Sequence, residues 1–482
     1  MKTIFYFTEN AADKRIFSAF LLSVILLTQC FLFPAKAFEL EKDELYVVDN
    51  LSDFFELEKD CSPQKVKLKG ISSDEPLHIS SDSINTLEFE ECNFSSTDIV
   101  LPETVSTLKL TRTEFKKYDF IKNSTLQELD LTGERFNDLS FIPDTLYSIG
   151  LYQSNIPSLK GIEKCKTLYF VEIYDVNIES IENLRNLKSI STLVLCGTFI
   201  DDISPVENLP LNYLDVSSST RIRSLEPVTN IETLETFYAY NCEMALTQKT
   251  IDFVQNHGFT ECAANAEGLD YQLQVKEIAE KIIKNDMTED EKIYAVTKYV
   301  VEHMEFDDKF YEDDSWALEL NRNGLKYALS GIGVCKNYTT LEGALLRLAG
   351  IDNYDIISED HIWNAVRKGN RYYGIDATFI DSFGDIEMEN DENYMEPYES
   401  FEKTHIGYVK PAGAYNIQTE ETSEEPDITE KPTEKSEEKT YEKDNKLIFA
   451  VIIAASVLAA GGIVSAFVIR KKKTQGNFEH RG

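Results

Sequence analysis

The sequence is poor in positive charge. Its 482 residues include 48 lysines and arginines against 84 aspartates and glutamates, a formal net charge of −36 at pH 7. A chain this acidic repels a phosphate backbone, so we do not expect a nucleic-acid partner, and cationic or lysine-rich surfaces fit better. The sequence also lacks any histidine and cysteine cluster with the spacing of metal ligands. We therefore expect no metal and no other cofactor.

The long apolar runs lie at the two ends of the chain and predict an exported, membrane-anchored protein. Residues 1–37 have the features of a signal peptide, with an uncleaved N-terminal anchor as the alternative. Residues 447–469 are uncharged and long enough for one transmembrane helix, and the basic residues in 470–482 predict a cytoplasmic tail. Residues 413–446 are almost without apolar side chains, which predicts a disordered acidic stalk. No LPxTG-like sorting sequence precedes the span, so we expect a single-pass cell-membrane protein with its N-terminal bulk extracellular.

An internal repeat occupies residues 84–245. Pairs of apolar residues recur about every 22 residues, each with a third apolar residue three positions earlier. The eight pairs are Leu87/Phe89, Leu108/Leu110, Leu129/Leu131, Ile149/Leu151, Val171/Ile173, Leu193/Leu195, Leu214/Val216 and Phe237/Ala239. This is the pattern of leucine-rich repeats, and the repeat bodies resemble the short bacterial, internalin-like type. Since one repeat cannot bury its own apolar face, we expect about eight to stack as a solenoid with a parallel sheet. Residues 38–83 and 246–270 should cap it, the second with a helix over 248–257.

The residues between the paired apolar positions should point outward and form the concave face of the solenoid. They are Glu88, Lys109, Asp130, Gly150, Glu172, Val194, Asp215 and Tyr238, flanked by Glu90, Thr111, Thr132, Tyr152, Tyr174, Cys196, Ser217 and Tyr240. Tyrosines among acids are typical of a binding surface, so we expect a protein or peptide substrate here; a merely solvated sheet face is the alternative.

The repeat cysteines have a structural interpretation. Cys92 and Cys242 occupy the turn position where such repeats carry asparagine or cysteine, which predicts buried thiols. A disulfide between Cys242 and Cys262 is an open alternative. The number of cysteines after the signal is odd, which fits at least one free thiol.

Residues 271–412 form a second unit, and a cysteine preceded by glycines lies near its middle. Gly331 and Gly333 predict a tight turn before Cys335, and the following leucines recur at helical spacing up to Gly350, which suits the positive φ of a helix C-terminus. These leucines are Leu341, Leu345 and Leu348. We expect Cys335 at the N-terminus of this helix, where the helix dipole and unpaired N–H groups favour the thiolate and make the sulfur nucleophilic.

Two β-rich runs follow and predict a hairpin around Gly369-Asn370. If these two residues form the turn, His361 lies diagonal to Asp376; if the turn begins one residue earlier, the two are directly opposed. In either register they share one face of the sheet, within reach of a hydrogen bond. An imidazole that is oriented by a carboxylate and presented to a thiol is the arrangement of an activated nucleophile.

Three motifs resemble the transglutaminase-like superfamily: G-V-C-x-x-Y at 333–338, H-x-W-N at 361–364, and a strand that ends in D-A-T at 376–378. The resemblance spans about residues 271–408. It implies a papain-like α+β core in which Cys335 is the nucleophile, His361 the general base and acid, and Asp376 the residue that holds the imidazole.

Other residues of the second unit are candidates for the same roles. Asp360 and Asp381 are alternatives to Asp376 as the orienting acid, although Asp360 points to the opposite face from the imidazole. His303 and His405 lack a comparable context, and we interpret both as structural. The main-chain N–H of the cysteine is one candidate oxyanion donor, and no side chain identifies itself as the second.

The sequence as a whole predicts a multidomain α+β protein: a leucine-rich-repeat solenoid, a papain-like or transglutaminase-like domain, a disordered stalk and one transmembrane helix. The expected function is a cell-surface cysteine enzyme that transfers or hydrolyses an amide acyl group through a thioester and is targeted by its repeats. A lysine amine as acceptor gives a crosslink, whereas water gives proteolysis or deamidation, and the sequence leaves these open. The alternative is a non-catalytic adhesin or receptor in which the catalytic fold is only a scaffold.

Overall fold

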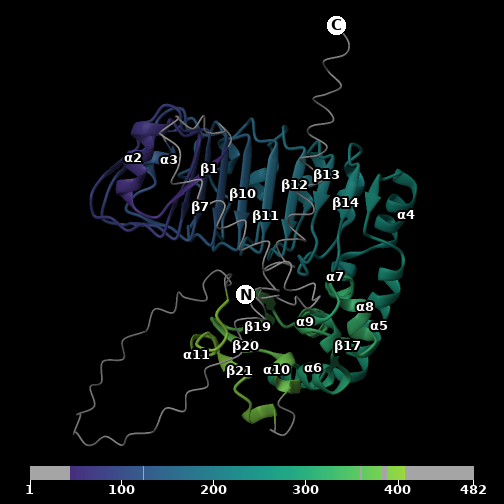
Figure 1. The fold of residues 1–482 in the computed structure, drawn as a ribbon. Coiled ribbons are helices and arrows are strands. Elements are labelled where there is room, and N and C mark those ends of the chain that lie inside the picture. Colours follow the sequence, from purple (N-terminus) through teal and green to yellow (C-terminus); the bar gives the residue numbers. More distant parts are fainter. Residues whose placement is uncertain (1–43, 123, 359–360, 383–387, 408–482) are drawn as a thin grey trace, which may run out of the picture.

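The structure is a computed structural model that describes residues 44–122, 124–358, 361–382 and 388–407 (Figure 1). A parallel-sheet solenoid lies across the top of the view, and a second domain of helices and an antiparallel sheet lies beneath its C-terminal half. The predicted signal peptide, stalk, transmembrane helix and tail lie outside the described residues, as does Asp360. Within the described part of the chain, no helix is both long and apolar enough to cross a bilayer.

The repeat region folds as predicted, because all eight motif segments are strands of one parallel sheet. They are β4 (Thr86–Glu90), β7 (Thr107–Thr111), β9 (Glu128–Thr132), β10 (Ser148–Tyr152), β11 (Phe170–Tyr174), β12 (Thr192–Cys196), β13 (Tyr213–Asp215) and β14 (Thr236–Tyr238). Equivalent positions pair in register, so that Leu108 lies beside Leu129, and both are fully buried. The repeated leucines therefore stack into one continuous apolar core, which stabilises the solenoid.

The two ends of the solenoid also contribute strands, which makes the sheet 11-stranded. The N-terminal end adds β1 (Leu45–Val48), α2 (Leu51–Cys61) and β2 (Lys65–Lys69), and the C-terminal end adds α4 (Gln248–His257), where a helix was predicted, and β15 (Glu261–Cys262). The remaining solenoid elements are β3 (Leu77–His78), β5 (Asn93–Phe94), β6 (Ile99–Val100), β8 (Glu114–Phe115), α3 (Asp119–Lys122) and the 3₁₀ turns η1 (Ile162–Lys164), η2 (Glu182–Leu184), η3 (Ser204–Asn208), η4 (Glu226–Asn230) and η5 (Glu243–Ala245).

The repeat cysteines are buried, as predicted. The Cys92 thiol donates to the carbonyl of Leu68 at 3.3 Å, and the Cys242 thiol donates to the carbonyl of Val216 at 3.2 Å. Every cysteine in the described residues is a free thiol, so no disulfide joins Cys242 to Cys262. These sulfurs therefore satisfy main-chain acceptors inside the turns.

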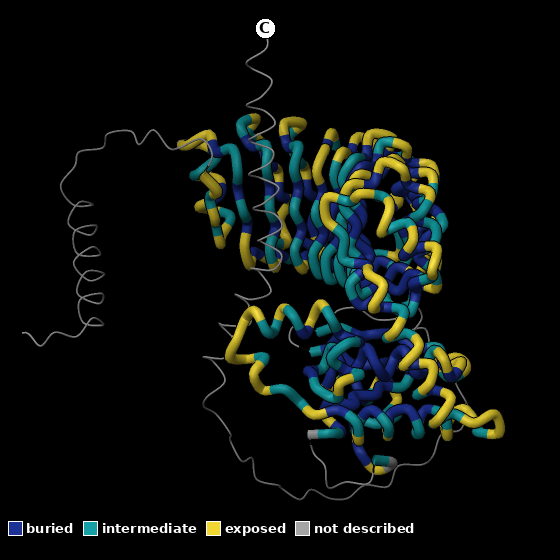
Figure 2. Tube along the Cα trace, turned by 90° about the vertical axis from the view of Figure 1, so that its right-hand side faces the viewer, coloured by how far each residue is buried: buried dark blue, intermediate teal, exposed yellow. Residues whose placement is uncertain are grey.

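The second domain places α9 (Cys335–Leu348) between helices and a four-stranded antiparallel sheet. The sheet consists of β18 (Asn353–Ile357), β19 (Ile362–Lys368), β20 (Arg371–Ile375) and β21 (Tyr394–Pro397). The other elements are α5 (Glu267–Ile282), α6 (Glu289–His303), β16 (Glu305–Phe306), η6 (Asp308–Tyr311), α7 (Asp314–Arg322), α8 (Gly324–Leu329), β17 (Ile332–Gly333), α10 (Ala377–Ser382), η7 (Met388–Asn390) and α11 (Tyr398–Phe401). Leu341 and Leu345 of α9 are fully buried, whereas Leu348, predicted on the same stripe, is 40% exposed. Figure 2 shows the buried residues as one run through the solenoid and a second cluster in this domain.

The two domains pack directly against each other through the loops that follow β12, β13 and β14. The ring of Phe199 lies 5.1 Å from that of Tyr354, and the guanidinium of Arg221 lies 4.0 Å over the same tyrosine. Arg221 also donates to Asp352 at 2.8 Å. Further along, the side chain of Asn241 donates to a main-chain carbonyl and accepts from a main-chain N–H of the second domain. The last repeats therefore form part of the packing that holds the second domain.

Candidate active site

Cys335 is the first residue of α9 and is half-buried, so the structure places it at the helix N-terminus as predicted. The turn before it depends on its glycines. Gly331 has a φ of +82°, and a Cβ added at Gly333 would lie 2.4 Å from the Cβ of Asn337. Asn337 accepts from the N–H of Val334 at 2.9 Å and donates to two carbonyls of the preceding helices. This buried amide fixes the turn that presents the sulfur.

His361 and Asp376 come together at one end of the β19–β20 hairpin. Lys368 pairs with Arg371, so Gly369 and Asn370 form the turn, and the first of the two predicted registers is correct. The strand ends at Ile375 rather than running through D-A-T, because α10 begins directly after the aspartate. Asp376 thus lies at a strand–helix junction, and its Oδ2 forms a short hydrogen bond with Nε2 of His361.

Asp376 is held as a carboxylate. It is 1% exposed, and its Oδ1 accepts hydrogen bonds from the N–H groups of Thr378 and Phe379 at 3.0 and 3.1 Å. Burial alone would raise the pKa of Asp376, but hydrogen bonds from His361, His405 and the main chain outweigh it and lower the pKa to about 2. The group is therefore ionised throughout the neutral range.

The imidazole of His361 interacts with both the Asp376 carboxylate and the Cys335 thiol. Burial lowers the pKa of His361, but hydrogen bonds with Asp376 and Cys335, together with their charges, raise it to about 10. Since Nε2 bonds to Asp376, Nδ1 is the ring nitrogen available for the hydrogen bond with the Cys335 sulfur. The ring of Phe379 stacks on the imidazole at a centroid distance of 4.6 Å and fixes its plane. The arrangement can hold a proton between sulfur and ring at neutral pH.

The interpretation of His405 as a residue outside the site was wrong. It is 4% exposed, and its Nε2 lies 3.2 Å from Oδ2 of Asp376, the oxygen that also contacts His361. Its Nδ1 lies 2.9 Å from the hydroxyl of Thr404, and its ring stacks on Phe401 at 4.0 Å. Because the ionised carboxylate of Asp376 can only accept, Nε2 of His405 carries a proton and donates it to this hydrogen bond. No local motif around residue 405 signals this contact, because it depends on how the segment after β20 folds back.

The other residues considered have contacts elsewhere. Asp381 accepts a hydrogen bond from the hydroxyl of Tyr338. His303 stacks on Tyr299 and contacts the carbonyl of Leu329, so its structural interpretation agrees with the packing.

His361, Asp376 and His405 also form a group whose ligand atoms lie within 4.8 Å of one another, close enough to surround a metal ion. Sequence spacing does not reveal this group, because its members come from three separate segments. Both imidazoles, however, already hydrogen-bond the carboxylate through Nε2. Those two bonds account for the proximity of the three groups without a cation.

A buried polar network joins the helix of Cys335 to the strand that follows His361. Glu342, two turns along α9, is 1% exposed and accepts from Thr297 of α6 at 2.8 Å and from Asn364 of β19 at 2.9 Å. Asn364 also donates to the carbonyl of Thr339 at 3.1 Å. Burial raises the pKa of Glu342 to about 7, although these hydrogen bonds oppose it. The network fixes the sulfur and the imidazole relative to each other, and no sequence motif pointed to Glu342.

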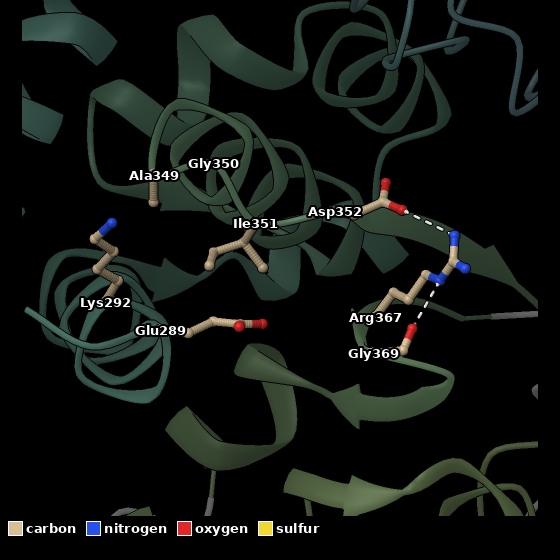
Figure 3. A pocket seen from close by; sticks show the side chains of 8 residues that line it. All are labelled: Glu289, Lys292, Ala349, Gly350, Ile351, Asp352, Arg367 and Gly369. Carbon is tan, nitrogen blue, oxygen red and sulfur yellow. Dashed lines mark hydrogen bonds and ion pairs between the residues drawn. The ribbon is translucent and has the colours of Figure 1, made fainter.

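A cavity of about 410 Å³ lies away from this site, at the opposite end of α9 (Figure 3). It is lined by Glu289, Lys292, Ala349, Gly350, Ile351, Asp352, Arg367 and Gly369. An α-helix rises about 1.5 Å per residue, so the 14-residue α9 separates the cavity from Cys335 by about 20 Å. The cavity is therefore not part of the cysteine site.

The fold and the site define a cysteine, histidine and aspartate arrangement on an α/β domain that is joined to a repeat solenoid. Residues 276–377 match the transglutaminase-like superfamily, and this range contains all three residues. The chain thus carries a transglutaminase-like domain.

The solenoid region has solved structural neighbours. An internalin of Listeria monocytogenes, InlF, is 17% identical with a TM-score of 0.30, and the match covers 43% of this chain and 64% of that one. Internalin C2 of the same organism is 20% identical (TM-score 0.27; 36% and 80% covered). A leucine-rich-repeat protein of Leptospira interrogans is 13% identical (TM-score 0.22; 45% and 82% covered). The chain thus spans less than two thirds of the InlF chain. No curated protein matches this chain.

Proposed function

We propose that this protein is a transglutaminase-like cysteine enzyme in which Cys335 is the nucleophile, His361 the general base and acid, and Asp376 the residue that orients the imidazole. The observation that carries the proposal is the hydrogen bond between His361 and the buried, ionised Asp376, with the Cys335 thiol acting on the same ring. The match of residues 276–377 to the superfamily supports this assignment.

The reaction follows from these positions. The sulfur attacks the carbonyl carbon of an amide, the C–N bond breaks, and the imidazolium gives its proton to the leaving nitrogen. The products of this half are a thioester on Cys335 and ammonia or an amine. An acceptor then loses its proton to the neutral imidazole and attacks the thioester, which restores the thiolate. The ionised Asp376 stabilises the imidazolium in both halves. The N–H of Cys335 remains the candidate donor to the oxyanion.

Two further groups act on the site through other residues. His405 gives Asp376 a second histidine contact, and the network around Glu342 sets the position of α9 against β19. We assign both as positioning residues, since neither contacts Cys335 or the second nitrogen of His361 in the hydrogen bonds described above.

The setting of the enzyme follows from the sequence. Its bulk is extracellular on a single-pass membrane anchor with a stalk, and its repeats bind a protein or peptide substrate on the concave face. The acceptor decides whether the outcome is a crosslink, cleavage or deamidation. The core is papain-like, with helix α9 packed on the antiparallel sheet.

A thiol-reactive amide probe tests the proposal. We expect Cys335 to be labelled much faster than Cys61, which is an exposed thiol on α2 and serves as an internal control. The His361→Ala variant should lose the preference for Cys335 and leave the labelling of Cys61 unchanged. Equal labelling of both cysteines in the wild type would contradict the enzyme and favour a non-catalytic adhesin or receptor with a transglutaminase-like scaffold.

A further inference from the structure

The concave face of the solenoid has two chemically different halves. In the N-terminal half, its acids are paired with lysines. Lys67 lies 3.0 Å from Glu88 and 2.8 Å from Glu90, and Lys109 lies 3.2 Å from Asp130. These carboxylates already have cationic partners, so this half presents little uncompensated charge to a ligand.

In the C-terminal half, from β10 to β15, the acids lie among tyrosines instead. The hydroxyl of Tyr152 donates to Glu172 at 2.8 Å, the hydroxyl of Tyr238 donates to Glu261, and Asp215 accepts from the N–H of Ser217. Within the described ranges, no lysine or arginine forms an ion pair with Glu172, Asp215 or Glu261. We define the acid–tyrosine patch as these three acids with Tyr152, Tyr174 and Tyr238.

Two of these tyrosines contact each other beside Glu172. The rings of Tyr152 and Tyr174 stack at 5.8 Å with planes 13° apart. Gly150 is needed for this, because a Cβ there would lie 2.5 Å from the Tyr152 ring and 2.6 Å from a carboxylate oxygen of Asp130. The glycine lets the tyrosine lie across its own strand. Aromatic faces beside carboxylates attract ammonium and guanidinium groups.

The protein places one of its own cations on this surface. The guanidinium of Arg322, the last residue of α7, lies 5.2 Å from the centre of the Tyr240 ring, next to the patch. Its charge also acts to lower the pKa of Asp215, which burial raises. An arginine on a tyrosine beside an acid is therefore already present at the edge of the patch.

The patch leads toward the nucleophile. Tyr174 is followed by Asp175, and burial raises the pKa of Asp175 to about 6 while the charge of Lys336 opposes the shift. Lys336 is the neighbour of Cys335 and lines the same recess as Thr198 and Thr220 of the repeats. The loops that follow β11, β12 and β13 thus adjoin the segment that carries the sulfur.

We propose that the acid–tyrosine patch docks a lysine- or arginine-bearing segment of the substrate protein or peptide and leads it toward Cys335. The overall negative charge does not explain this choice, because it attracts cations to both halves. In the described residues, the C-terminal half differs because its acids form no ion pair and lie beside tyrosine rings. The docking rests on the patch alone, and its link to the reaction rests on the proposed function. It makes amides near basic residues the preferred substrates.

Peptide binding to the full chain tests the docking. A fluorescent peptide with several lysines is compared with a matched peptide in which glutamine replaces each lysine, by anisotropy, on the Cys335→Ser variant so that no turnover occurs. We expect the lysine peptide to bind at least about tenfold more tightly, and Glu172→Gln to weaken it about fivefold, in the range of one cation contact at a half-buried site. The matched control Glu88→Gln removes the same charge from the N-terminal half and should change binding less than about twofold.

The outcomes separate the docking from the enzyme. Equal losses in Glu172→Gln and Glu88→Gln overturn the docking, because attraction then follows net charge alone. Equal binding of the two peptides also overturns it, because the lysine side chains are then not recognised. The ratio of kcat/KM for lysine-flanked over glutamine-flanked amide substrates should also fall in Glu172→Gln. If the peptides bind as expected but the thiol-reactive probe does not label Cys335 in the wild type, the proposed enzymatic function is wrong and the proposed docking still holds. A Tyr174→Leu variant repeats the test without changing the charge of the protein. It should weaken the binding of the lysine peptide and leave the binding of the glutamine peptide unchanged.

Discussion

The solenoid and the transglutaminase-like domain are stabilised by different kinds of buried contact. In the solenoid each apolar residue packs on its equivalent in the neighbouring repeat, as Leu108 does on Leu129. In the transglutaminase-like domain the contacts around the proposed site are polar and join separate segments, such as Glu342 with Asn364 and Asp376 with His405. Truncation of one leucine should therefore lower the stability of the solenoid. Removal of one hydrogen bond in the second domain should instead change the relative positions of the site residues. Substitutions in the two domains should separate these two kinds of loss.

The largest expected effect is on chemistry alone. The Cys335→Ala variant should lose at least about 10³-fold in amide turnover, because no other group in the site can form the thioester. Its unfolding transition should stay close to that of the wild type, since the sulfur is half-buried at a helix end. Steady-state turnover and thermal unfolding monitored by circular dichroism measure the two quantities. Turnover that survives the substitution would remove Cys335 from the mechanism.

A core truncation in the solenoid should do the reverse. Leu129→Ala should lower the free energy of unfolding by about 2–5 kcal/mol, since the side chain is fully buried in the repeat core. The turnover of the protein that remains folded should be retained. The matched control is Leu348→Ala, at a leucine of the transglutaminase-like domain that is 40% exposed. There we expect the free energy of unfolding to fall by less than about 1 kcal/mol. Chemical denaturation gives both values, and equal losses would show that the repeat core is not tightly packed.

Glu342 tests the network that joins α9 to β19. Glu342→Leu removes the acceptor of one N–H of the buried Asn364 amide and of the Thr297 hydroxyl, which should cost about 1–3 kcal/mol and lower kcat. Glu342→Gln keeps one hydrogen-bonding oxygen and should recover most of the stability. Because burial raises the pKa of Glu342 to about 7, the wild type should already bind a proton there near neutrality, and the glutamine should imitate that form. An unchanged kcat in Glu342→Leu would show that the network contributes to stability and not to turnover.

His405 should affect rate with little effect on substrate affinity. His405→Phe preserves the stacking on Phe401 but removes a hydrogen bond to Asp376, so kcat should fall about tenfold with KM unchanged. The pKa of Asp376 should rise, which moves the acid limb of the pH–rate profile upward. His257→Phe is the comparison in the solenoid, where that ring packs among phenylalanines, and it should leave the profile in place. An unmoved acid limb in His405→Phe would make His405 a packing residue.

The pH dependence of stability follows from the two shifted pKa values in the site. The pKa of His361 is raised from 6.5 to about 10, so its contribution to stability is fully present below pH 6.5 and is lost as the pH rises toward 10. The pKa of Asp376 is lowered from 3.8 to about 2, so its contribution is present above pH 3.8 and is lost as the pH falls toward 2. Unfolding of wild type and His361→Ala across pH 6–10 measures the first contribution. Identical curves for the two proteins would contradict it.

The contrast between the domains also explains what the sequence could predict. The repeat strands, the buried turn cysteines and the helix at 248–257 follow from spacing, because each depends on contacts with the adjacent repeat or turn. The sequence of the turn limited the register of the β19–β20 hairpin to two possibilities. His361 and Asp376 lie close together because one precedes the first strand of the hairpin and the other follows the second.

The missed features depend on contacts without a local signal. His405 reaches Asp376 only because α11 and the residues after it fold back on the sheet. Leu348 continues the leucine spacing of α9 but lies at the exposed helix end. The packing of Arg221 on Tyr354 joins residues of two domains, and neither side carries a motif for it.

Intact-protein mass spectrometry during turnover tests the central claim most directly. With an amide substrate and quenching in acid, the wild type should carry one acyl group bound as a thioester on Cys335, formed with release of ammonia or an amine. The adduct should accumulate more slowly in His361→Ala and be absent in Cys335→Ala. Amide turnover without an acyl adduct on Cys335, or with the adduct on another residue, would contradict the account.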